Sequence, residues 1–147
     1  MNKLSSIEAI NRARDSHISQ MKKIELLIGG EEIENPTSVK HTECVFGKWF
    51  YNKDNQVEEI LGSLFYEKME ILHTKWHGEY ARVFEIFFTN RKTGFFSKIL
   101  GTDKIDEMDM DKAKLYYREL QATTELLLHA ISSSQRRISA LSDSKFK

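Results

Sequence analysis

Residues 71–80, ILHTKWHGEY, belong to a stretch in which apolar and aromatic side chains recur three or four residues apart. One face of this stretch carries Gly62, Tyr66, Met69, His73, His77, Tyr80, Phe84 and Phe87. That spacing is the period of an α-helix and predicts one long helix over residues 56–90. Further apolar residues widen the apolar arc, which is typical of a helix that is buried or packed on two sides.

Two more long helices are predicted, one before and one after this stretch. The apolar spacing indicates a helix over residues 4–28, which the glycine pair at 29–30 would end, because glycine adopts a left-handed cap without steric cost. A last helix is expected to begin at a cap on Asp109 or Asp111 and to end near Leu141. Its inward face, which we call the seam, has the spacing of helices that pack on antiparallel or coiled neighbours. The seam consists of Ala113, Tyr117, Leu120, Thr124, Leu127, Ile131, Ser134, Ile138 and Leu141.

A short helix from about Glu43 to Tyr51 is predicted between the first two long helices, and it contains the only cysteine, Cys44. Seven Gly and one Pro are too few for the many tight turns of an all-β chain. We therefore predict an all-α, four-helix-bundle-like fold with three long helices and one short helix that carries the cysteine. The length fits one domain over residues 1–147. The segment GFFSKIL, residues 94–100, is predicted to be a loop over the bundle end rather than a membrane-surface patch.

Charge and composition exclude several functional classes. Lys plus Arg and Asp plus Glu number 22 each, so the chain has no overall field that attracts nucleic acid. No apolar run approaches the ~20 residues of a membrane span, and the N-terminal residues lack the apolar core of a signal peptide. A single cysteine cannot form an internal disulfide. We therefore expect a cytoplasmic protein with no nucleic-acid partner and no membrane span.

The motif HTKWH suggests a metal site. It places His73 and His77 at positions i and i+4 of a helix, so both imidazoles lie on one face and can reach one ion. Both lie on the apolar face, where a buried imidazole needs partners for its ring nitrogens. His17 lies on the inner face of the first helix, and Cys44 lies in the short helix. Three imidazoles and a thiolate form a complete tetrahedral ligand set for Zn²⁺, and these donors disfavour Mg²⁺ and Ca²⁺.

Other interpretations of these residues remain open. A lone core histidine is more often hydrogen-bonded than metal-bound, and a lone buried cysteine usually acts as a small apolar side chain. A di-iron site is not supported, because Glu70 and His73 form the single Glu-x-x-His motif. A haem pocket would leave Cys44 without a role. His41, three residues before the cysteine, is the fallback fourth ligand, and His129 is predicted at the surface.

The order and spacing of these residues resemble the chemoreceptor zinc-binding (CZB) domain family. The resemblance rests on a helical His17, on CVFGKWF with Cys44, Gly47 and Trp49, and on HTKWH. It covers about residues 10–90 and implies a four-helix bundle that binds one Zn²⁺ through three His and one Cys. The residues that would bind the zinc are His17, Cys44, His73 and His77.

Within the short helix, Gly47 would allow close approach of the backbone, and Trp49 would anchor the segment in the bundle. Members of the family lie on cytoplasmic chemoreceptors and diguanylate cyclases. They regulate output in response to zinc or to oxidants such as hypochlorous acid, usually as dimers. The resemblance therefore implies a regulatory module, not an enzyme, and a chemoreceptor or diguanylate cyclase as a signalling partner.

Apolar surface gives a separate reason to expect a homodimer. The wide arc on residues 56–90 and the seam together offer more apolar surface than one small bundle is expected to hide. The sequence contains neither a chemoreceptor signalling hairpin nor a cyclase domain, so we expect either a stand-alone sensor that acts in trans or a module of a longer protein. The initiating Met favours the stand-alone sensor. A purely structural zinc in an adaptor protein is the main alternative. A zinc hydrolase that keeps an open coordination position is a further one.

Overall fold

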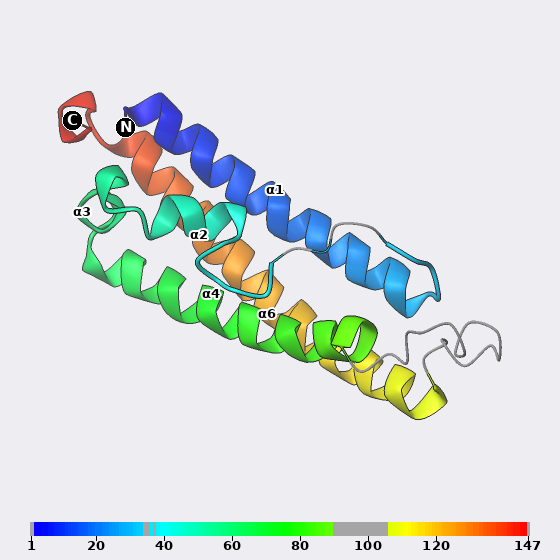
Figure 1. Ribbon diagram of the computed structural model, residues 1–147. Coiled ribbons are helices and arrows are strands. Elements are labelled where there is room, and N and C mark those ends of the chain that lie inside the picture. Colours follow the sequence, from blue (N-terminus) through cyan, green and yellow to red (C-terminus); the bar gives the residue numbers. More distant parts are fainter. Residues whose placement is uncertain (1, 34–35, 37, 90–105, 147) are drawn as a thin grey trace.

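The computed structural model describes residues 2–33, 36, 38–89 and 106–146, and these form helices packed side by side (Figure 1). No strand occurs within these ranges, so the all-α prediction is confirmed. The elements are α1 (Lys3–Ile28), α2 (Val45–Phe50), the 3-10 turn η1 (Lys53–Asn55), α3 (Val57–Leu61), α4 (Ser63–Phe84), the π-helical turn η2 (Glu85–Thr89), α6 (Glu107–Ala140) and the 3-10 turn η3 (Asp143–Lys145).

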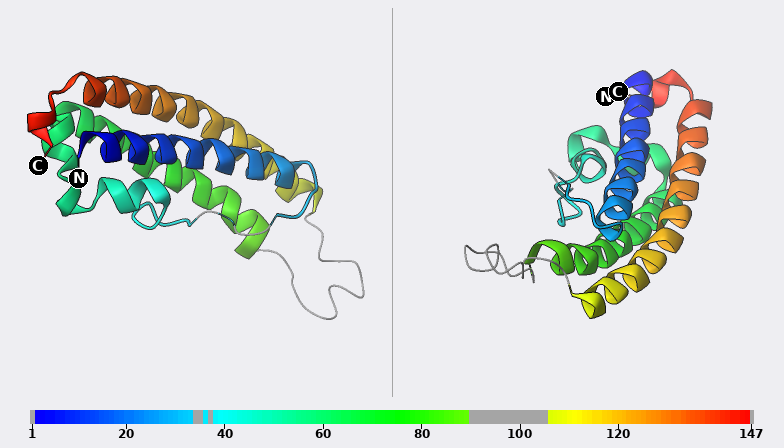
Figure 2. Two further views of the ribbon diagram at one scale, coloured as in Figure 1. Left: turned by 90° about the horizontal axis from the view of Figure 1, so that it is seen from above. Right: turned by 90° about the vertical axis from the view of Figure 1, so that its right-hand side faces the viewer.

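Three long helices make up the bundle. Helix α6 runs antiparallel to both α1 and α4 and packs against each of them (Figure 1). The short α2 packs on α1, and α3 packs on α4 and α6. The start of α1 and the end of α6 therefore lie at the same end of the molecule (Figure 2).

The helix predicted over residues 56–90 is interrupted, so that prediction is partly wrong. Gly62 separates α3 from α4 with φ +84° and ψ 153°, a backbone conformation open essentially to glycine alone. Gln56, just before α3, also has a positive φ of 51°. Periodicity did not reveal the break, because Gly62 falls in register with the apolar face on both sides of it.

The start of the last helix also differs from the prediction. The N-cap is Asp106, whose side chain accepts a hydrogen bond from the backbone N–H of Asp109 at 2.8 Å. Asp109 and Asp111 are therefore not caps. The correction follows from the geometry of helix starts, since the cap residue precedes the N–H group that it satisfies by about three positions.

The seam of α6 is buried within the chain. Leu120, Leu127 and Ile131 are fully buried, Tyr117 and Leu141 are half-buried, and the face packs against α1 and α4. Two polar contacts tie the helices together: the Trp76 indole N–H donates to Thr124 Oγ1 at 2.8 Å, and Gln135 Nε2 donates to Asn11 Oδ1 at 2.8 Å. The seam thus stabilises the monomer rather than offering a free surface.

The connections between the helices lie only partly within the described residues. The predicted loop at residues 94–100 lies outside the described residues. The connection between α2 and α3 contains the 3-10 turn η1. Among the described helices, none combines the length and the apolar character that crossing a membrane requires.

Candidate metal centre

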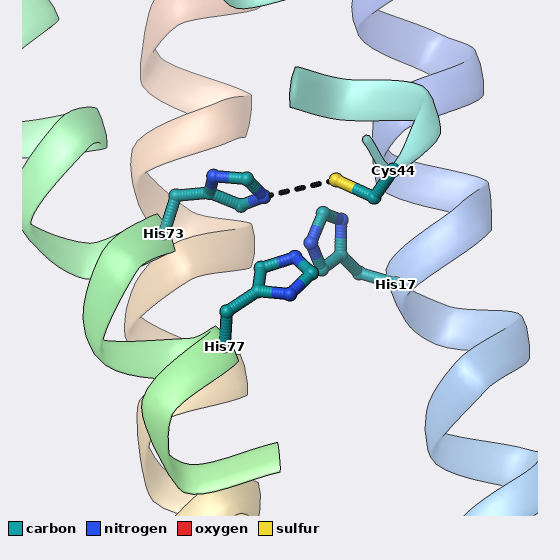
Figure 3. Close-up of side chains that lie close together, drawn as sticks. All are labelled: His17, Cys44, His73 and His77. Carbon is teal, nitrogen blue, oxygen red and sulfur yellow. Dashed lines mark hydrogen bonds between the residues drawn. The ribbon is translucent and has the colours of Figure 1, made fainter. Parts of the chain in front are cut away.

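The structure brings the four predicted ligands together from three separate segments. His17 lies on α1, His73 and His77 lie on successive turns of α4, and Cys44 is the residue that begins α2. All four side chains point toward one another (Figure 3). Their donor atoms all lie within 4.8 Å of one another, and each residue is at most 4% exposed. We call these four residues the 3His/1Cys cluster.

The turn before α2 fixes the position of the thiol. Cys44 is the N-cap of α2, and its Sγ accepts a hydrogen bond from the Gly47 backbone N–H at 3.2 Å. The preceding turn crosses α2 so closely that a Cβ on Gly47 would collide with the backbone carbonyl oxygen of His41. Gly47 therefore permits this close approach, as expected. Trp49 is buried on the same short helix and anchors the segment.

Backbone carbonyl groups orient two of the three imidazoles. His17 Nδ1 lies 2.8 Å from the Ala13 carbonyl oxygen, and His77 Nδ1 lies 2.9 Å from that of Val39. A carbonyl oxygen only accepts, so Nδ1 carries the proton in both rings and Nε2 keeps a free lone pair. A hydrogen bond from Nδ1 to a backbone carbonyl is typical of histidines that bind a metal through Nε2.

The third imidazole contacts the thiol directly. His73 Nε2 lies 3.3 Å from Cys44 Sγ (Figure 3). Two buried ring nitrogens, His73 Nδ1 and His77 Nε2, have no hydrogen-bond partner among the described residues. An unpartnered buried polar atom costs free energy, and such atoms are rare in folded proteins. The unpartnered His77 nitrogen is the one that its tautomer leaves free as a donor to a metal.

Burial sets the protonation states of the cluster. It lowers the pKa of His17 and of His77 to about 4. It lowers the pKa of His73 to about 2, and the neighbouring imidazoles of His17 and His77 add to this effect. Burial raises the pKa of the Cys44 thiol, while the Gly47 N–H opposes the rise. The histidines are therefore neutral near pH 7, as metal ligands have to be, and a cation would favour the thiolate.

The cluster fits Zn²⁺ better than the other common ions. It offers one sulfur and three imidazole nitrogens and no carboxylate, which is a donor set that zinc prefers and that Mg²⁺ and Ca²⁺ do not. Four donors complete a tetrahedral site.

Comparison with known protein families agrees with this geometry. Residues 17–84 match the family model described as the chemoreceptor zinc-binding domain. The chain carries a domain of the CZB family. The matched segment begins at His17 and ends at Phe84, the last residue of α4, so it contains the whole 3His/1Cys cluster. Searches among curated proteins and among solved structures gave no match.

The two remaining histidines lie outside the cluster of the CZB domain. His41 is half-buried, with its ring centroid 6.3 Å from that of His73 and 5.3 Å from that of Tyr51. His129 is exposed on α6, as predicted. His41 therefore lies next to the cluster without belonging to it.

Sequence reasoning missed the aromatic and carbonyl surroundings of the cluster. The Trp76 ring centroid lies 4.7 Å from that of His17, and the Phe46 ring centroid lies 4.1 Å from that of His73. The carbonyl of Ala13 was open to prediction, because it lies four residues before His17 on one helix. The carbonyl of Val39 had no sequence signal, since it belongs to an irregular segment 38 residues away from His77.

Proposed function

We propose that this chain is a zinc-binding regulatory module in which the 3His/1Cys cluster binds one Zn²⁺ and Cys44 acts as the switch. The observation that carries the proposal is the convergence of four buried donor atoms within 4.8 Å of one another. Four protein donors leave no open position for an activated water, so we propose a regulatory role rather than an enzymatic one. When bound, zinc would keep the thiol deprotonated and join α1, α2 and α4.

The segment that leads into α2 depends on the cluster for its attachment to α4. Val39 accepts a hydrogen bond from His77, and Cys44 Sγ contacts His73. Lys40 and Glu43 form an ion pair at 3.7 Å, but both side chains are exposed and the pair adds little. Loss of a ligand would therefore free this segment from α4, while α1, α4 and α6 stay packed through the seam.

Oxidation of the thiolate is the proposed input. Hypochlorous acid converts a thiolate to sulfenic acid and releases chloride; sulfur loses the two electrons that the chlorine gains. Cys44 is the one residue of the cluster open to this reversible oxidation. Helix α6, which packs on both α1 and α4, would pass the shift to a partner. We propose a chemoreceptor or a diguanylate cyclase in the cytoplasm as that partner, because CZB domains are associated with chemotaxis and cyclic-di-GMP signalling.

Metal stoichiometry tests the ligand set. Native mass spectrometry should find one zinc per chain, and alanine at any cluster residue should lower that occupancy. His41→Ala and His129→Ala are matched controls, since both remove an imidazole outside the cluster, and both should keep full occupancy. Retention of zinc by Cys44→Ala together with loss in His41→Ala would show that the fourth ligand was wrongly chosen.

Removal of zinc by a chelator distinguishes a sensor from a protein in which zinc only stabilises the fold. The core of α1, α4 and α6 is held by residues outside the cluster, such as Trp76 and Thr124, so the metal-free chain should stay helical by far-UV circular dichroism. Backbone amide hydrogen exchange should rise over residues 38–44 and stay low in α6. Cooperative loss of all helical signal on chelation would support a purely structural zinc instead.

Oxidant treatment tests the switch itself. Hypochlorous acid should increase amide exchange over residues 38–44 in the wild type and leave Cys44→Ser unchanged. Zinc should be released gradually, because three imidazoles still bind it after the thiolate is lost. A Cys44→Ser protein that responds like the wild type would remove the redox part of the proposal and leave zinc sensing.

We also propose that the chain forms a symmetric homodimer. The support is an apolar patch of Leu64, Ile71 and Leu126, which are between 55% and 76% exposed on adjoining faces of α4 and α6. Analytical ultracentrifugation at high micromolar concentration should detect a dimer, and Ile71→Glu should shift it toward monomer. Glu125→Gln, on exposed α6 surface, is the control. A wild-type monomer at that concentration would contradict the dimer.

A further inference from the structure

A concave site lies at the end of the bundle where α4 begins and α6 ends. It is formed between the first turns of α4 and the last turns of α6. Its volume is about 640 Å³, which is within the range of roughly 300–1,000 Å³ for small-molecule pockets. Phe65 and Met69 of α4 line it on one side, and Ser133, Ser134, Arg136 and Arg137 of α6 line it on the other. None of these residues belongs to the 3His/1Cys cluster.

The charged side chains that line this pocket are all positive. Lys68, Arg136 and Arg137 line it, and no carboxylate of the described residues does. Glu67 and Glu59 line neighbouring hollows, yet neither forms an ion pair within 4 Å with these cations in the described part of the chain. Within the described part of the chain these three cations have no ion-pair partner, and in a chain of zero net charge they create a local positive potential that attracts anions.

The two arginines are held in place by neighbours that leave their donors available. The Arg137 guanidinium lies over the Phe65 ring, 5.2 Å from its centroid, so the side chain is oriented at the pocket wall. Arg136 donates one hydrogen bond to Ser133 Oγ at 3.2 Å. A guanidinium has five N–H donors in a planar fork, and this fork matches a carboxylate or a phosphate group.

A buried hydroxyl supplies the independent second observation. Ser134 lines the pocket, is 0% exposed, and its Oγ has no hydrogen-bond partner among the described residues. A helical serine commonly bonds to the carbonyl four residues earlier, so an unpartnered one is unusual and costs free energy. A ligand oxygen at this position would satisfy the hydroxyl.

We propose that this pocket binds a small organic anion with an apolar body. The carboxylate or phosphate group accepts hydrogen bonds from Arg136, Arg137 and the Ser134 hydroxyl. The apolar part packs against Phe65 and Met69. The lining combines cationic and hydroxyl groups with apolar side chains, so a molecule that carries both an anionic head group and an apolar body matches it.

Titration with short-chain amphiphiles tests this site in the zinc-loaded protein. Octanoate and octyl phosphate are the anionic probes, and octanamide is the neutral control of matched chain length. Backbone amide shifts in ¹⁵N spectra should saturate at Phe65, Met69 and Ser134 with one or both anions and not with the amide. The anion that binds more tightly identifies the preferred head group. Equal shifts with octanamide, or no saturable shift at millimolar concentration of either anion, would overturn the proposal.

Variants then assign the contacts. Arg137→Gln should weaken binding about tenfold, which corresponds to about 1.4 kcal/mol, and Arg137→Lys should fall in between because it keeps charge without the fork. Ser134→Ala should weaken binding without lowering the urea midpoint, since the hydroxyl it removes has no partner in the free protein. Arg118→Gln, exposed about five turns earlier on the same helix, should bind as the wild type does. Unchanged affinity in Arg137→Gln and Ser134→Ala would place the anion elsewhere.

Discussion

The sharpest single test of the metal centre is a methyl group at Gly47. The residue is helical, so alanine would ordinarily stabilise α2 by about 1 kcal/mol through its higher helix propensity. The Cβ, however, would collide with the carbonyl oxygen of His41 and come within 2.9 Å of the carbonyl carbons of His41 and Thr42. These are backbone atoms, which cannot rotate away as a side chain would. The turn before Cys44 has to move.

The expected magnitude follows from these opposing contributions. Overpacking against a rigid neighbour costs about 1–3 kcal/mol, and the overlap here is severe enough to place the cost at the upper end. After the gain in helix propensity, the free energy of unfolding should fall by about 2 kcal/mol. Because the displaced turn positions the thiol, the affinity for zinc should fall about tenfold as well, as is common when a group that orients a metal ligand is changed.

Gly78→Ala is the matched control. Gly78 is also helical, it follows His77 directly, and nothing lies within 4 Å of a Cβ built on it. This variant should gain about 0.5–1 kcal/mol and keep its zinc affinity. Urea unfolding followed by circular dichroism, and competition with a chromophoric chelator, measure the two quantities. Equal stability and equal zinc affinity in the two variants would refute the close-approach role of Gly47.

Three further outcomes are expected. In metal-free protein the free energy of unfolding should fall between pH 7.5 and pH 5 by about 2 kcal/mol per cluster histidine, because the unfolded chain takes up protons near pH 6.5 while the folded rings, with depressed pKa values, stay neutral. A flat profile of urea midpoints would mean that these rings are not buried and neutral. Gly62→Ala should lose about 1–3 kcal/mol in thermal unfolding, since φ +84° strains any L side chain and Arg137 Nη2 lies 3.3 Å from the new Cβ. Trp76→Phe should lose about 1–2 kcal/mol, because it leaves the buried Thr124 hydroxyl without its indole donor; no change in the urea midpoint would show that this hydrogen bond adds nothing to stability.

Much of the metal centre was accessible from residue types and spacing. His73 and His77 lie one turn apart on a helix because i and i+4 share a face, whatever the rest of the fold does. The identity of the donors pointed to zinc, since thiolate and imidazole preferences belong to the side chains themselves. The predicted helices also suggested His17 and Cys44 as partners, the resemblance to the CZB family agreed with this choice, and the structure places both against the α4 pair.

Irregular backbone was beyond sequence reasoning. The break at Gly62 and the cap at Asp106 each depend on the backbone of a single residue, and periodicity averages over a whole turn. The burial of the seam also required the structure. A pattern of apolar spacing shows that a face is covered. It does not show whether the covering helix belongs to the same chain or to a second copy.

The sequence by itself determined the local features of this protein: the helices of α1, α4 and α6, the paired histidines and the donor chemistry. Each of these depends on contacts within about one helical turn. Only the tertiary structure decided which nitrogen of His77 is free, because the carbonyl of Val39, 38 residues away, selects its tautomer. It likewise decided that Cys44 Sγ lies beside His73 Nε2 while His41 lies outside the cluster. Those outcomes depend on packing between segments far apart in the chain, and no local pattern encodes that packing.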